Sequence, residues 1–133
     1  MRRGLQLILG LLLSVTVSAA YADSKKPRLV EVWHVGDDSL SQGLFLTVEN
    51  TFKRSQDFAL SSGRKPGTLV VTIPTNVDWR QVGKRTRVLY AVEFSSTEGR
   101  NLGVRKGSCW EDEMERCAAQ IVQDAKKAAG KMD

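Results

Sequence analysis

The two cysteines limit how the end of this chain folds, because they lie close together and form the only possible pair. Cys109 and Cys117 are eight residues apart. Along one straight helix their Cα atoms would be about 12 Å apart, whereas a disulfide joins Cα atoms roughly 4.4 to 6.8 Å apart. We therefore expect Cys109 to precede the last helix and the chain to fold back, so that Cys117 meets it and forms a structural disulfide. A redox pair would more usually be Cys-x-x-Cys, and Cys-x7-Cys beside a single histidine is not a zinc pattern.

The first 22 residues have the organisation of a secretory signal peptide. Arg2 and Arg3 are followed by an apolar segment at 5–17, LQLILGLLLSVTV, and by Ala-Tyr-Ala at 20–22, a small-x-small cleavage site. The segment is shorter than the roughly 20 residues of a transmembrane helix, so an uncleaved anchor is the less favoured alternative. No cysteine follows it to carry a lipid. We expect an exported protein with no stable transmembrane anchor after cleavage, periplasmic or, as the alternative, secreted.

Cleavage would leave residues 23–133, a length suited to one domain. Without Arg2 and Arg3 the formal charge is +5 − 2 = +3. This mild positive charge suits solubility and an acidic partner, and is far from the basic stripe of a nucleic-acid binder. We therefore expect no nucleic-acid partner.

Apolar periodicity predicts a mixture of strands and helices. In the first helix, apolar residues recur every four positions, and Ser39 and Gln42 resemble a capping box. Trp33 is expected in the core, and residues 74–85 are expected to be a connection. Strands are predicted at 28–35, 57–61, 68–73, 86–95 and 102–105, and helices at 39–54 and from about 111 to 130. This order predicts an α+β two-layer sandwich, with two helices on one face of a mainly antiparallel sheet of four or five strands.

The segment LTVENTFKRSQDFAL at 46–60 runs from the first helix into a strand that begins near Phe58. This pattern and the order of elements resemble the small α+β domain at the amino end of the bacterial envelope protein TolB, a domain type also found in some outer-membrane accessory lipoproteins. The resemblance implies accessory binding work in the envelope and carries over no catalytic residues. The chain differs in having no propeller after the domain and no lipidation cysteine.

No recognisable catalytic constellation occurs in the sequence. His34 is the only histidine and has no partner near it in sequence, so a satisfied strand histidine is favoured over a catalytic one. Carboxylates are crowded at the start of the last helix, where the helix dipole already explains them, although paired carboxylates also hydrolyse glycosides. These are Glu111, Asp112, Glu113 and Glu115. We expect no catalytic residue, no metal site and no cofactor.

Basic residues are expected to gather at one end of the predicted meander. The 74–85 connection and the end of the 102–105 strand would meet there, beside the acidic start of the last helix. The candidate partner-binding surface comprises Trp79, Arg80, Lys84, Arg85, Arg105, Lys106 and Trp110. The acidic residues leave open whether the cluster is neutralised within the molecule.

These features favour a non-enzymatic periplasmic module that binds another envelope protein or an anionic envelope component through surface recognition. The alternative is a secreted inhibitor or immunity protein that blocks an enzyme cleft, with the loop at 111–115 inserted. A small cell-wall hydrolase is a remote third hypothesis. The sequence names neither the partner nor the oligomeric state.

Overall fold

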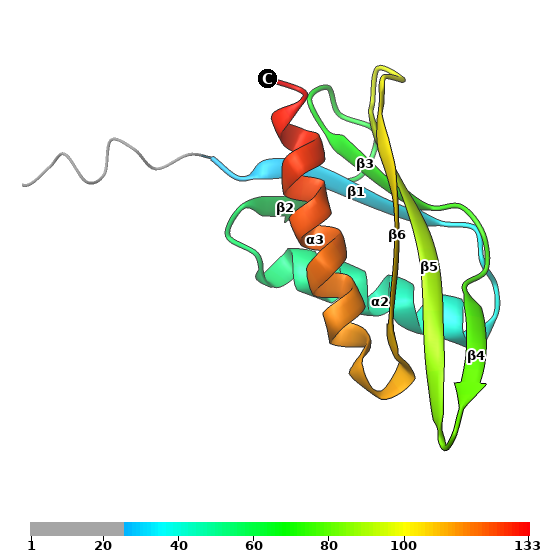
Figure 1. Cartoon of the computed structure of the whole chain (residues 1–133). Helices are drawn as coiled ribbons and strands as arrows, with labels where there is room; N and C mark the ends of the chain where they lie inside the picture. The colour runs from blue at the N-terminus through cyan, green and yellow to red at the C-terminus, as the bar shows by residue number, and fades with distance from the viewer. Residues whose placement is uncertain (1–25) are drawn as a thin grey trace, which may run out of the picture.

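A computed structural model describes residues 26–133, so the predicted signal peptide lies outside the described residues. One six-stranded sheet carries two helices (Figure 1), which confirms the α+β prediction; the sheet has six strands, not the four or five expected. The elements are β1 Arg28–His34, α2 Ser39–Arg54, β2 Phe58–Leu60, β3 Leu69–Ile73, β4 Asp78–Val82, β5 Arg85–Ser96, β6 Asn101–Trp110, the 3₁₀ helix η1 Glu111–Glu113 and α3 Met114–Gly130.

The first half of the sheet is parallel. β1 lies between β2 and β3 and runs parallel to both, because α2 carries the chain from the end of β1 back to the start of β2. β5 then pairs antiparallel with β3, β4 and β6. The expected up-and-down meander is therefore wrong for β1 to β3, although three of the five strand pairings are antiparallel.

Strand β5 joins the rest of the sheet. Its 12 residues carry β6 along one edge, and β3 and β4 share the other edge, β3 beside residues 93–96 and β4 beside residues 85–89. Two predicted boundaries are wrong here. β4 lies inside the expected connection, and β6 has ten residues where a strand over 102–105 was expected.

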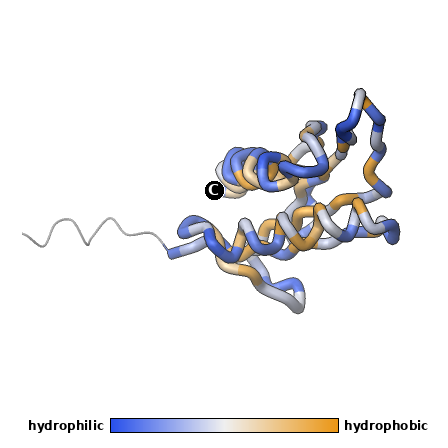
Figure 2. The backbone as a smooth tube through the Cα atoms, turned by 90° about the horizontal axis from the view of Figure 1, so that it is seen from below, coloured by the Kyte–Doolittle hydropathy of each residue, from blue (hydrophilic) through white to orange (hydrophobic). Residues whose placement is uncertain are grey.

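Both helices cover the same face of the sheet and pack against each other (Figures 1 and 2). From α2, Leu44, Val48 and Phe52 are buried, and the ring of Phe52 meets Phe58 of β2 edge-on with centroids 5.0 Å apart. From α3, Ile121 is fully buried beside alanines. Each large apolar side chain removed from water in this way contributes about 1.5 to 3 kcal/mol.

The start of α2 is fixed by Asp38, not by the expected Ser39 capping box. Asp38 is the N-cap, and its carboxylate accepts a hydrogen bond of 2.7 Å from the backbone N–H of Ser41. The Ser41 hydroxyl accepts one of 2.9 Å from the Val77 N–H. This contact ties the start of α2 to the segment that leads into β4.

Within residues 26–133, no helix covers the opposite face of the sheet. Trp33 lies on that face and is 47% exposed, so its expected place in the core is wrong. The reason is strand alternation: Val30 and Val32 face the helices, and Glu31 and Trp33 face away. The Trp33 indole N–H donates to the Glu31 carboxylate, which also accepts a 3.1 Å bond from the Arg64 N–H.

One close contact inside the sheet requires a glycine. Tyr90 of β5 is 5% exposed and lies over Gly107 of β6, its direct partner. A Cβ at Gly107 would be 2.3 Å from the Tyr90 hydroxyl oxygen. That hydroxyl has no hydrogen-bond partner within residues 26–133, and burial, with a smaller contribution from Asp124, raises the pKa of Tyr90 to about 12.

We predict that Gly107→Ala destabilises the protein by about 1 to 3 kcal/mol, because the added methyl overpacks the core against Tyr90. Gly43→Ala is the matched control, since the nearest side-chain atom to its new Cβ is 3.7 Å away, and alanine in a helix is favoured by about 0.5 to 1 kcal/mol over glycine. Urea denaturation measures both variants. Wild-type stability in Gly107→Ala would contradict the packing described here.

Candidate partner-binding surface

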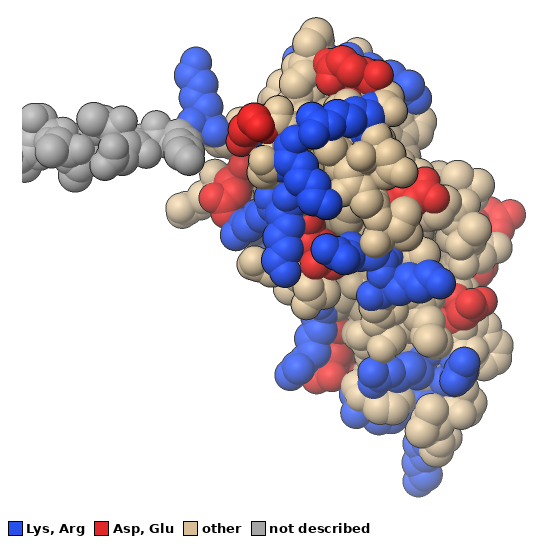
Figure 3. Space-filling view, turned by 45° about the horizontal axis from the view of Figure 1, so that its top comes forward, with Lys and Arg blue, Asp and Glu red and all other residues tan. Residues whose placement is uncertain are grey.

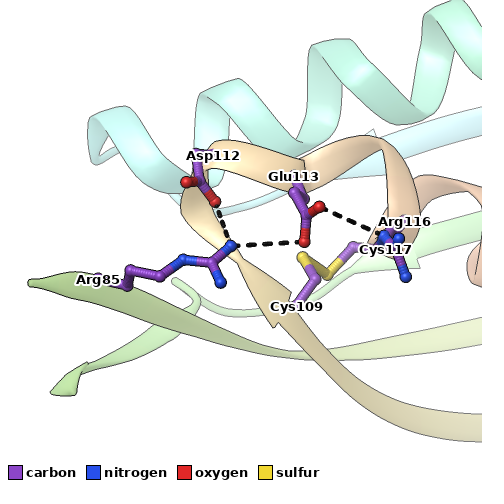
Figure 4. Close-up of polar contacts among 6 residues, drawn as sticks. All are labelled: Arg85, Cys109, Asp112, Glu113, Arg116 and Cys117. Atoms are coloured by element: carbon purple, nitrogen blue, oxygen red, sulfur yellow. Dashed lines mark hydrogen bonds and ion pairs between the residues drawn. A yellow bond between two sulfur atoms is a disulfide. The ribbon is translucent and has the colours of Figure 1, made fainter. Parts of the chain in front are cut away.

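The disulfide predicted from the sequence is present. Cys109 near the end of β6 and Cys117 in the first turn of α3 have Cα atoms 5.6 Å apart and bonded sulfurs. The 3₁₀ helix η1 turns the chain back between them (Figure 4). The bond ties α3 to the end of the sheet, and it indicates an oxidising compartment outside the cytoplasm.

Three residues from three strands form one row across the face of the sheet without helices. Arg80 of β4 is the partner of Arg87 of β5, and Arg87 is the partner of Trp110 of β6. Directly opposed residues share a face. The Arg87 guanidinium lies 4.9 Å from the Trp110 ring centroid and donates to the Ser108 hydroxyl at 2.9 Å. These contacts therefore hold the Arg87 side chain in a fixed orientation beside Arg80.

Arg85 lies over the same indole and is neutralised. Its guanidinium is 4.3 Å from the Trp110 ring centroid and forms ion pairs of 2.8 Å with Asp112 and 3.5 Å with Glu113 (Figure 4). The hydrogen bond to Asp112 is the main reason that the pKa of Arg85 is raised above its ordinary value. These exposed pairs add little stability, but they remove Arg85 as a free cation.

The remaining cations near the β4–β5 turn are not neutralised. Within residues 26–133, Arg80, Lys84 and Arg87 form no ion pair with a carboxylate. All five residues of β4 are exposed, and Trp79 and Val82 are 58% and 52% exposed. We call Trp79, Arg80, Val82, Lys84 and Arg87 the tip surface. Arg80, Val82 and Arg87 lie on the face that carries Trp110, and Trp79 lies on the other face of the ribbon because it is the partner of Val88. The tip surface lies at the opposite end of β5 from the β5–β6 hairpin (Figure 1).

The structure does not bring Arg105 and Lys106 to this tip. They pair with Val92 and Ala91 in the middle of β6, so Arg105 is 110 − 105 = 5 residues, or about 17 Å, from Trp110. The expected meeting fails because β6 continues to Trp110. The two side chains also face opposite sides of the sheet, because alternate strand residues do so.

Arg87, Val82 and Ser108 belong to this region and were not identified from the sequence. The signal for Arg87 was its place in the predicted 86–95 strand, on the face opposite Val88 and Tyr90. The partner strands and their register were needed to place Trp110 and Arg80 beside it, and a single sequence does not supply the register.

Other candidate residues have local partners. The His34 ring lies 4.0 Å from the Phe45 ring, and its Nδ1 is 2.9 Å from the Gly36 carbonyl oxygen. Among residues 26–133, no group of three or more His, Cys, Asp or Glu side chains is arranged to hold a metal ion. In the same range, neither helix combines the length and apolar character that crossing a bilayer requires.

No protein-family model and no curated protein matches the chain. Solved structures that share its fold include two bacterial proteins. A minor lipoprotein from Acinetobacter baumannii aligns with TM-score 0.51 and 9% identity over 79% of this chain and 92% of that chain. A PelC dodecamer from Paraburkholderia phytofirmans aligns with TM-score 0.52 and 13% identity over 78% of this chain and 87% of that chain. Neither is TolB, so the resemblance holds only as a small α+β fold that a bacterial lipoprotein shares.

We predict that replacing both cysteines, Cys109→Ser with Cys117→Ser, lowers the free energy of unfolding by about 2 to 3 kcal/mol, because the bond closes a loop of eight residues. Guanidinium denaturation of the oxidised wild type and the double variant measures the difference. Reductant should reproduce the loss in the wild type and leave the variant unchanged. If reductant lowered the free energy of unfolding of the double variant as much as that of the wild type, the loss would not come from the Cys109–Cys117 bond.

Proposed function

We propose that this protein is a non-enzymatic, exported binding module, located in the periplasm, that recognises another component of the cell envelope through the tip surface. The leader-like segment at 1–22 and the disulfide support export. The shared fold with a minor lipoprotein is consistent with envelope work.

One observation carries the proposal: β4 buries none of its five residues, yet it presents Val82 on the same face as Arg80 and Arg87 and Trp79 on the other face of the same ribbon. Within residues 26–133 those two arginines form no ion pair. These apolar groups contribute little to the protein's own core. Exposed tryptophan and arginine are the residues that most often dominate binding energy at protein interfaces. Trp110 holds Arg87 in place before contact, which lowers the entropy lost on binding.

The geometry gives less support to the inhibitor and hydrolase hypotheses. Both need the carboxylates at 111–115 to be available to a partner or a substrate. Asp112 and Glu113 are instead engaged by Arg85, and Glu113 also by Arg116 at 3.6 Å. Two of the four carboxylates in this segment are therefore already paired within the molecule.

We predict that Trp79→Ala/Arg80→Ala/Arg87→Ala reduces capture of the partner from envelope extract at least about tenfold, because truncating interface anchors commonly costs 2 kcal/mol or more. The control is Lys53→Ala/Arg54→Ala, two cations at the far end of α2, about 24 Å from its start. Quantitative mass spectrometry of captured proteins gives the readout, and thermal unfolding verifies folding. Undiminished capture by a folded triple variant would rule out the tip surface.

A second candidate function is assembly of this chain with itself through the face that carries no helix. Trp33 and Val104 are 47% and 50% exposed, and both lie on that face. The similar PelC structure is a dodecamer. An exposed aromatic and aliphatic face of this kind is typical of subunit interfaces.

We predict for this candidate that the wild type has the mass of an oligomer in analytical ultracentrifugation, and that Trp33→Glu/Val104→Glu has the mass of a single chain. Buried carboxylates without partners strongly destabilise an interface. Leu46→Glu, at a residue 55% exposed on α2, should leave the mass unchanged. A single-chain wild type would reject self-assembly and leave the tip-surface proposal intact.

A further inference from the structure

The outer edge of β6 is a second candidate interface, separate from the tip surface. β6 pairs with β5 along one edge, and within residues 26–133 no strand pairs with its other edge. The residues from Val104 to Lys106 and Ser108 are exposed. A long edge strand of this kind is a template for pairing with another chain.

The hydrogen bonds of the β5–β6 hairpin show which backbone groups point outward. The Ser96 N–H donates to the Arg100 carbonyl, and the Thr97 N–H points the other way, to the Thr68 carbonyl beside β3. Backbone groups alternate along a strand, so Val92 and Tyr90 of β5 bond to their β6 partners Arg105 and Gly107. Val104, Lys106 and Ser108 therefore present their N–H and C=O groups away from the sheet.

Cations flank this edge on both sides. Arg105 faces the helix side, where it lines a hollow of about 70 Å³ together with Lys127 of α3 and Lys131, the residue that follows α3. Lys106 faces the other side. Asp124 is the one carboxylate that lines the hollow, and within residues 26–133 Arg105, Lys106 and Lys127 form no ion pair. Figure 3 shows Lys and Arg side chains gathered over the end of the molecule that carries the carboxyl-terminal half of α3.

The same charges select what can pair with the edge. If two copies paired antiparallel about Lys106, their Arg105 and Lys106 side chains would crowd together, and like charges placed opposite each other are destabilising. A neutral strand would form no charge-assisted contact with the four cations at this edge, which are Arg105, Lys106, Lys127 and Lys131. An acidic strand gains charge-assisted contacts on both of its faces.

We infer that the outer edge of β6 accepts an extended acidic segment of a partner protein as an added strand. The segment's backbone pairs with Val104, Lys106 and Ser108. Its side chains alternate between the Arg105–Lys127–Lys131 side and the Lys106 side, so carboxylates are needed on both faces. This mode of recognition takes affinity from main-chain hydrogen bonds and specificity from the flanking side chains.

The test uses the purified chain and an eight-residue peptide of valine, threonine and glutamate, with glutamates at adjacent central positions so that both faces are acidic. Hydrogen exchange followed by NMR should slow about tenfold or more at the outward amides of Val104, Lys106 and Ser108. The amides of Arg105 and Gly107 are already paired with β5 and should change little.

Two controls make the result specific. The same peptide with glutamine in place of glutamate should bind at least about tenfold more weakly, and so should the acidic peptide with Arg105→Gln/Lys106→Gln. Lys53→Gln/Arg54→Gln removes the same charge from the end of α2 and should have no effect. The tip-surface variant should bind the peptide normally, which separates this inference from the proposed function.

Three results would overturn the inference: no protection at the three outward amides, equal binding of the glutamine peptide, or protection confined to the tip surface. Vesicles of phosphatidylglycerol are the last comparison. Binding to vesicles through Arg105 and Lys106 without any peptide binding would assign these cations to a membrane surface instead.

Discussion

The pairing of β5 with three other strands is the constraint on which the rest of the structure depends. Its register places Arg87 between Arg80 and Trp110, and Val88 beside Cys109. It thereby sets the row of side chains at the tip, the position of the disulfide and the direction of the free edge of β6. A shift of one residue would reverse the faces of all these side chains. The register is stabilised by burial on the helix side, where Val88, Val92 and Phe94 are almost fully removed from water.

Placing both helices on one face divides the molecule by role. On the helix side, α2 and α3 bury the apolar groups that stabilise the fold, and the disulfide holds the start of α3. The other face and the two ends of β5 are left to solvent, with Trp33, Trp79 and Val104 exposed. Groups that the fold does not need for its own stability are therefore concentrated away from the helices, where a partner can reach them.

Much of the fold follows from apolar periodicity. Leu44, Val48 and Phe52 at four-residue spacing predict α2, and alternation predicts β5. The errors arise where that signal is absent. β4 and the middle of β6 bury little. Their sequences, DWRQV and VRKGS, therefore lack the apolar alternation that predicts a strand. Trp33 alternates onto a face that only the three-dimensional structure shows to be uncovered. The register that joins Arg87 to Trp110 is a long-range property of the sheet. The cysteine spacing predicted the disulfide because its geometry is local and strict.

We propose that a partner is recognised at the tip of the β4–β5 ribbon and along the edge of β6, not on the helices. Site-specific photocrosslinking in the intact cell envelope tests this most directly, with a photoreactive residue placed in turn at Lys84, Lys106 and Lys53. The account predicts crosslinked products from the positions at the tip and the edge and none from Lys53 at the end of α2. Products from Lys53 alone would contradict it.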